Sequence, residues 1–262
     1  MLVALPEGDV PKTVAPIEPS TAVAKINLPT EPPKVEEAPA LAVSDDCKID
    51  LGLSAGTQAM ISVTLTAPCR AGERVVLRHA GLAIAEVVAK DGTLILDLPA
   101  LSAEGEVSVL FPDAETAVGK VAIPDLASVK RFGVQWMADD AFQLHILEAG
   151  ADYGQPGDVW TDAPVSPNGG YLVALGNPEL TLPMMANVYT WPADSSIAAD
   201  VMLEAEVTEK TCGRELLGEA LALEAGSVDI TELTLAMPGC DALGDILVLK
   251  NPGQDVTLSA SN

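Results

Sequence analysis

From residue 47 onward, apolar and polar residues alternate with a period of two, which is the pattern of strands that bury one face. The first two strands flank a turn signal, Ser-Ala-Gly-Thr at 54–57. Their apolar positions are Ile49, Leu51 and Leu53 before the turn, and Ile61, Val63 and Leu65 after it. The pattern predicts a β-hairpin at the start of the folded part of the chain.

Five more short strands are predicted before residue 125. Their ranges are 74–78, 82–89, 93–98, 106–111 and 119–123. Asp91-Gly92, between the second and third of these, is a tight-turn signal because the pair readily adopts the positive φ angles of primed turns. Seven short strands separated by regular turn signals predict a β-sandwich domain over 45–125.

A second strand-rich region follows, and eight of the nine aromatic residues lie between positions 132 and 191. The alternating segments 134–137 and 142–147 predict a hairpin around the turn 138–141. A loop-rich stretch at 150–158 leads into Val159-Trp160, and further strands are predicted at 171–175, 188–191, 198–208, 216–224, 227–236 and 245–251. The strands before and after Ala225-Gly226 are expected to pair, although 208–223 also fits a helical pattern. We therefore expect an all-β chain with a second antiparallel β-sandwich-like domain over 126–262.

Residues 1–44 differ from the rest of the chain, since they hold eight of its 20 prolines and no aromatic residue. Proline removes backbone donors and fixes φ, so this segment is predicted to be a disordered, semi-extended tail. At about 3.1 Å per residue its reach is at most about 130 Å. It is either a spacer between a membrane anchor and a globular head or an unstructured tail without that role.

The four cysteines form two pairs along the sequence, and four cysteines allow three connectivities. Pairing Cys47 with Cys69 and Cys212 with Cys240 fits best, because each pair brackets two predicted strands and a turn. Each bond would stabilise the fold by about 3 kcal/mol. A zinc site is less well supported, since the sequence contains no CxxC. The alternative is four buried free thiols in a cytoplasmic protein.

Two disulfides would place the chain in an oxidising compartment. Residues 1–16 lack the features of a signal peptide, because they have no basic start and the short apolar stretch ends at Pro6. We therefore expect an export signal or a membrane anchor upstream of Met1.

Composition excludes several classes of partner. The chain has 14 Lys and Arg against 38 Asp and Glu, a formal charge of −24, which argues against nucleic acid and against an anionic membrane surface. No apolar run approaches the roughly 18–20 residues of a membrane helix. The charge is explained by solubility, or by long-range attraction of a basic partner surface.

The sequence contains no HExxH, Walker A or EF-hand pattern. Both histidines, His79 and His145, are expected to be structural. The enzymatic alternative is a hydrolase built on His145 and nearby aspartates. The sequence predicts no cofactor.

Two groups of side chains are candidate binding residues. Tyr153, Trp160 and Trp191 lie in or beside loops and would form a binding surface, unless they belong to the core of the second domain. Loop aspartates in the same region could hold calcium, although solvated turn residues explain them better; they are Asp139, Asp140, Asp152, Asp158 and Asp162.

The string GVQWMADDAFQLHILEAGADYGQPGDVWTDAP at 133–164 resembles a signature of uncharacterised exported proteins of marine and purple alphaproteobacteria. The stretches 205–215 and 245–252, and the segments around Cys47 and Cys69, are similar to that group too, so the resemblance covers 45–255. It implies an N-terminal membrane segment followed by a proline-rich spacer. Some members carry the label "translocase", and the resemblance implies no catalytic residues.

Together these features predict a non-enzymatic periplasmic binding or accessory protein, tethered to the inner membrane and contacting a protein or membrane complex. The alternative functions are a carbohydrate- or envelope-binding module and a hydrolase.

Overall fold

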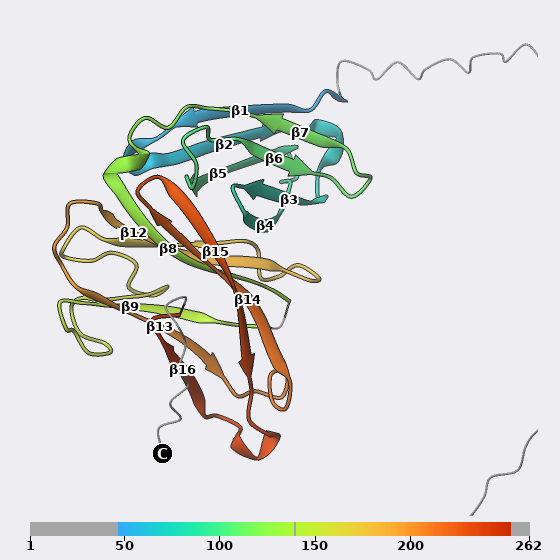
Figure 1. Cartoon of the computed structure of the whole chain (residues 1–262). Helices are drawn as coiled ribbons and strands as arrows, with labels where there is room; N and C mark the ends of the chain where they lie inside the picture. The colour runs from blue at the N-terminus through green and yellow to red at the C-terminus, as the bar shows by residue number, and fades with distance from the viewer. Residues whose placement is uncertain (1–46, 139, 253–262) are drawn as a thin grey trace, which may run out of the picture. The chain divides into compact units, whose positions relative to one another are not determined.

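A computed structural model describes residues 47–138 and 140–252 (Figure 1). Within these ranges the chain forms strands in four antiparallel sheets, joined by single turns of 3₁₀ helix, and contains no α-helix. The prediction of an all-β fold is confirmed. The predicted proline-rich tail at 1–44 lies outside the described residues.

Two sheets come from the N-terminal part of the described chain. One has the strand order β1-β2-β5 and the other β4-β3-β6-β7. Their strands are β1 (Asp50–Ala55), β2 (Met60–Thr66), β3 (Arg74–His79), β4 (Leu82–Val87), β5 (Thr93–Pro99), β6 (Val107–Leu110) and β7 (Thr116–Gly119). The predicted first hairpin is confirmed, with Leu51 opposite Leu65 and Leu53 opposite Val63.

The tight turn predicted at Asp91-Gly92 is present, since the amide of Gly92 donates to the carbonyl of Ala89 and Gly92 has a φ of +80°. It joins strands of different sheets, because β4 pairs with β3 whereas β5 pairs with β2. Gly92 accepts a hydrogen bond from the amide of Ala67, which continues the β2–β5 pairing by one position beyond the two strands. The last strand ends at Gly119, so the predicted strand at 119–123 is wrong, and the amide of Val121 instead donates to Gly105 outside any ladder.

The remaining strands form a five-stranded sheet, β11-β12-β8-β14-β15, and a four-stranded sheet, β10-β9-β13-β16. The five-stranded sheet contains β8 (Val129–Met137), β11 (Tyr171–Leu175), β12 (Met184–Pro192), β14 (Glu215–Glu224) and β15 (Ser227–Ala236). The four-stranded sheet contains β9 (Gln143–Glu148), β10 (Asp158–Val159), β13 (Ala199–Glu206) and β16 (Ile246–Lys250).

The predicted hairpin of 134–137 with 142–147 is wrong, because β8 and β9 lie in different sheets. Both edges of β8 are occupied by β12 and β14, and both edges of β9 by β10 and β13. The predicted pairing around Ala225-Gly226 is confirmed as the β14–β15 hairpin, with φ of +51° and +81° at the two turn residues. The helical alternative for 208–223 is wrong, since its second half is strand β14.

The five-stranded sheet buries apolar side chains on both faces, and Figure 1 shows it between the N-terminal sheets and the β9-β13-β16 strands. Val188, Leu221 and Leu223 pack with the N-terminal core. Phe132 and Tyr189 pack with the core against the four-stranded sheet. Residues 47–252 lie in one compact unit, so the domain boundary at 125 stays a prediction.

Both disulfides favoured by the sequence are present. Cys47 is bonded to Cys69 at the open end of the first hairpin, and Cys212 is bonded to Cys240 near the start of β14. Disulfides of this kind indicate an extracytoplasmic location. No helix within 47–138 and 140–252 has the length and apolar character needed to cross a membrane.

His79 is a buried, fully paired histidine at the end of β3, as expected for a structural residue. Its Nε2 accepts the amide of Leu101 at 2.8 Å, and its Nδ1 lies 2.7 Å from the carbonyl of Glu106. These partners assign the neutral tautomer with hydrogen on Nδ1. Burial lowers the pKa of His79 below its ordinary value, and the nearby charge of Arg131 acts in the same direction.

This geometry predicts a pH dependence of stability. The unfolded chain binds a proton at His79 below about pH 6.5, whereas the folded chain resists it, so stability is full above pH 6.5 and declines as the pH falls towards the lower folded pKa. Between pH 7.5 and 5.5, the wild type is expected to lose about 1 kcal/mol more unfolding free energy than His79→Gln. Urea denaturation of the wild type and His79→Gln at both pH values measures this. Equal losses in the wild type and His79→Gln would contradict it.

Candidate binding groove

One face of the five-stranded sheet is covered by the tip of the β3–β4 hairpin. Gly81 in that tip has a φ of +92°, and a Cβ atom placed on it would lie 2.2 Å from Cδ1 of Ile230 on β15. Leu221 on β14 is buried under the same tip. The absence of a side chain at position 81 therefore permits the close approach of the hairpin to the sheet.

The side-chain amide of Gln135 holds the hairpin in place. Its oxygen accepts the amide of Ala83 at 2.8 Å, and its nitrogen donates to the carbonyl of Gly81 at 2.9 Å and also to Glu219. Because β4 is an edge strand, the Gln135 amide satisfies backbone groups that a neighbouring strand would otherwise pair. Gln135 thus marks the boundary between the covered and uncovered parts of the sheet face.

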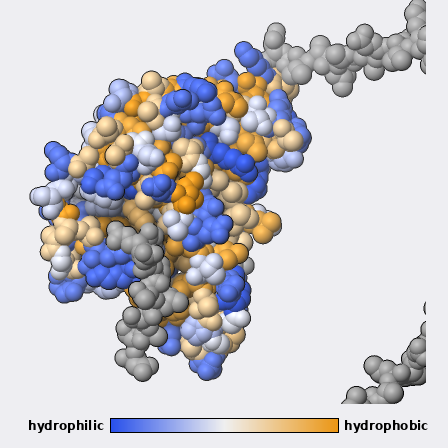
Figure 2. All heavy atoms as spheres, in the orientation of Figure 1, coloured by the Kyte–Doolittle hydropathy of each residue, from blue (hydrophilic) through white to orange (hydrophobic). Residues whose placement is uncertain are grey.

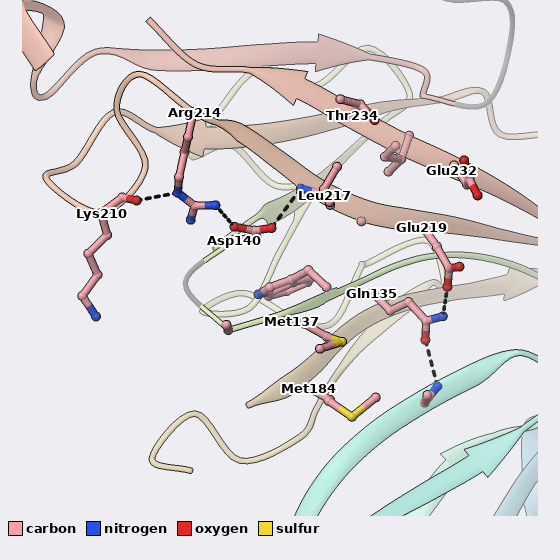
Figure 3. A pocket seen from close by; sticks show the side chains of 15 residues that line it. Gln135, Met137, Asp140, Met184, Lys210, Arg214, Leu217, Glu219, Glu232 and Thr234 are labelled. Carbon is pink, nitrogen blue, oxygen red and sulfur yellow. Dashed lines mark hydrogen bonds and ion pairs between the residues drawn. The ribbon is translucent and has the colours of Figure 1, made fainter. Parts of the chain in front are cut away.

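Beyond Gln135 the same face is open. Met184 lies opposite Met137 in the β12–β8 ladder, and Leu217 lies opposite Thr234 in the β14–β15 ladder. Met137 is 55% exposed and Leu217 is 57% exposed, although both continue the rows of side chains that are buried under the hairpin. The result is a groove of about 860 Å³ whose surface is mainly apolar (Figure 3).

An ion pair fixes one end of the groove. Asp140 accepts hydrogen bonds from the guanidinium of Arg214 and from the amide of Leu217, the latter at 2.9 Å. Arg214 also donates from Nε to the carbonyl of Lys210 at 2.6 Å, and Figure 3 shows the three residues in a chain along this end. The adjoining Cys212–Cys240 disulfide ties the same loop to the segment after β15. This end of the groove, the Arg214–Asp140 wall, is therefore held by a disulfide and an ion pair.

The aromatic residues predicted to form a binding surface do not gather in one place. Trp160 stacks on His145 with ring centroids 4.9 Å apart, and Tyr153 meets the same histidine edge-on at 5.1 Å. Trp191 stacks instead on Tyr189, at 5.2 Å. Each ring is thus engaged with another ring, although Tyr153 remains 47% exposed. A binding role for these three residues stays a prediction.

His145 forms a buried pair with Asp158, through Nδ1 and Oδ1 at 2.7 Å. Asp158 also accepts the amide of Gly154 at 2.8 Å, so the pair fixes the loop that follows β9. Within the described part of the chain, the contacts of His145 bring no serine or threonine hydroxyl to it. The pair therefore has a positioning role in the fold, and the hydrolase alternative gains no support from it.

The loop aspartates are not arranged around a common point. Asp140 pairs with Arg214 and Asp158 with His145, while Asp152 and Asp162 are exposed. Asp139 lies outside the described residues. In the ranges that the structure describes, no three His, Cys, Asp or Glu side chains are grouped as metal ligands. The contacts therefore do not support the calcium interpretation.

Sequence reasoning missed the groove, because its residues come from five strands and the loops between them and match no motif. One signal was present. Leu216 and Leu217 are adjacent, and so are Met184 and Met185, whereas a strand with one buried face alternates. One member of each apolar pair must then face outward, unless the sheet is buried on both sides.

No protein-family model, curated protein or solved structure matches this chain. The functional argument therefore depends on the geometry of the groove.

Proposed function

We propose that this chain is a non-enzymatic periplasmic binding protein, and that a segment of a partner protein occupies the groove beside β8, β12 and β14. The observation that carries the proposal is the exposure of Met137 and Leu217 on a sheet face that is buried further along, at Ala186 and Leu221. An apolar hollow with a polar rim is the usual form of a recognition site. Methionine adapts its shape to different apolar partners, and Met137 and Met184 lie side by side here.

The chemistry of the groove favours a protein segment over a sugar. Carbohydrate sites present exposed aromatic rings as platforms, whereas Trp136, which lines the groove, is half-buried and packs edge-on against Phe142 with ring centroids 6.1 Å apart. The exposed surface consists instead of thioether and aliphatic side chains, which bury well against the side chains of a peptide.

The arrangement in the cell is also part of the proposal. The disulfides support an oxidising compartment, and we place the chain in the periplasm, anchored in the inner membrane through a segment upstream of Met1. Residues 1–44 would act as the spacer between anchor and head. The head would consist of two sandwich-like domains, 45–125 and 126–262, and the chain would belong to the group of exported proteins that it resembles.

Co-purification from detergent-solubilised membranes tests the proposal. Met137→Gln with Leu217→Gln is expected to reduce recovery of the partner about tenfold, because both side chains lose apolar contact. Both residues are exposed, so the fold should tolerate the change. Ile95→Gln is the matched control, since Ile95 is 73% exposed on β5, outside the groove. Recovery of the protein alone, or equal partner loss in both variants, would refute the role of the groove.

A further inference from the structure

Two carboxylates lie directly opposite each other at one end of the groove. Glu219 on β14 is the register partner of Glu232 on β15, so the two side chains leave the same face of the sheet. Figure 3 shows both on the side of the groove away from Arg214. Like charges at directly opposed positions destabilise a ladder, and a glutamate paired with a lysine would stabilise it. Stability of the fold does not account for this pair.

No cation of the described chain neutralises the pair. Glu219 accepts one hydrogen bond, from the neutral amide of Gln135, and Glu232 makes no hydrogen bond or ion pair with any described residue. Arg214 is engaged by Asp140 at the other end of the groove. Arg78 on β3 lines the adjacent hollow together with Glu219 but forms no ion pair with it. The two charges therefore face the groove without a partner from the fold.

The surroundings decide what kind of cation fits. Two carboxylates are too few for a metal site, and no third ligand is grouped with them in the described ranges. The next row of the sheet face presents Leu217, which is apolar and exposed. A lysine or arginine side chain matches both features, since its aliphatic stem packs on apolar surface while its charged end reaches the carboxylates.

We infer that the partner segment carries a lysine or arginine whose cationic group lies between Glu219 and Glu232. An apolar residue of the same segment packs on Met137 and Leu217. This inference rests on the proposed function of the groove and names the chemistry of its occupant. The charge of −24 on the whole chain adds long-range attraction for such a segment.

Three capped peptides, Ac-Gly-Leu-Lys-Leu-Gly-NH₂ and its analogues with Gln or Glu in place of Lys, test the inference with the full chain. Titrations followed by ¹H–¹⁵N NMR report both affinity and the residues that respond. The Lys peptide is expected to bind about fivefold more tightly than the Gln peptide, and the Glu peptide most weakly. Glu219→Gln with Glu232→Gln is expected to remove the preference for Lys and to change the affinity for the Gln peptide by less than about twofold.

A charge-matched control separates the site from the overall field of the protein. Glu179→Gln with Glu206→Gln removes the same two charges at exposed positions outside the groove and should leave the Lys preference intact. An equal effect of this control would overturn the inference. Neutralising the opposed pair should also leave the protein at least as stable as the wild type, so unfolding cannot explain a loss of binding.

The outcomes distinguish the inference from the proposed function. If all three peptides bind with equal affinity and Leu217→Gln weakens each of them, the groove is a binding site and the assignment of a cation is wrong. If no peptide shifts any resonance of Met137, Met184 or Leu217, both the proposed function and the inference are wrong. Concentration-dependent dimerisation through the groove, seen by light scattering and abolished by Leu217→Gln, would assign it to a second copy and overturn both.

Discussion

Replacing Arg131 with methionine is expected to lower the free energy of unfolding by about 3–5 kcal/mol, the largest effect of any single substitution considered. Arg131 is almost completely buried on β8, and its guanidinium binds the N-terminal sheets. It donates to the carbonyls of Gln58 and Ala59, at 2.8 and 3.0 Å, and to that of Ala100. Methionine fills part of the space but removes a donor from the buried carbonyls of Ala59 and Ala100, of which the Ala59 carbonyl still accepts the amide of Ala100. A buried acceptor that loses its donor costs more than the lost hydrogen bond itself.

The neighbouring lysine provides a matched control for Arg131. Lys130 lies on the same strand, is partly exposed and pairs with Glu224 at 3.2 Å, so Lys130→Met should change stability by less than about 0.5 kcal/mol. Arg131→Lys keeps the charge but has one nitrogen in place of three, and should fall between the other two variants. Urea denaturation at pH 7.5 measures all three. Similar free energies of unfolding for Arg131→Met and Lys130→Met would show that the hydrogen bonds of the buried guanidinium contribute little to stability.

Much of the fold could be predicted from local patterns. Alternation identified strands such as β11 and β15 with nearly correct bounds, and Ala225-Gly226 identified the β14–β15 hairpin, because a short turn with positive φ forces its flanking strands to pair. The pairing of the cysteines could be predicted in a similar way, because each disulfide joins the two ends of a local segment. These features depend on residues close together in sequence.

The assignment of strands to sheets could not be predicted in the same way. Asp91-Gly92 has the chemistry of a hairpin turn, yet it joins β4 and β5 in different sheets, and 138–141 likewise joins β8 and β9 in different sheets. Alternation shows which side chains share a face, but not which strand lies alongside. That choice depends on long-range contacts such as Arg131 with Ala100 and Gln135 with Ala83, which no local pattern contains.

The candidate site was beyond prediction for the same reason. Aromatic residues in loops are a general signal of binding surfaces, so the sequence favoured Tyr153 and Trp160 as binding residues. In the structure both rings contact His145. The groove depends on the registers of β8, β14 and β15 and on where the β3–β4 hairpin stops covering them. Even the opposed glutamates, 13 positions apart, become neighbours only once the β14–β15 register is known.

Removal of either disulfide is expected to lower the free energy of unfolding by about 3 kcal/mol, because the bonds close segments of similar size, with sequence separations of 22 and 28. Cys47→Ala with Cys69→Ala, and Cys212→Ala with Cys240→Ala, are therefore matched variants for stability. Urea denaturation without reductant should give similar losses. Alkylation and mass spectrometry of the unreduced wild type should find no reactive thiol, and four alkylated cysteines would contradict the extracytoplasmic location.

The two variants should nevertheless differ in binding, because only one bond adjoins the groove. Cys212–Cys240 fixes the loop that carries Lys210 and Arg214, whereas Cys47–Cys69 closes the β1–β2 hairpin in another sheet. Loss of Cys212–Cys240 should make the Arg214–Asp140 wall mobile. Partner recovery should then fall several-fold, because the partner must order this loop on binding. Loss of Cys47–Cys69 should leave recovery unchanged at a temperature where both variants are folded. Equal weakening in both would mean that binding follows global stability and not the geometry of the groove.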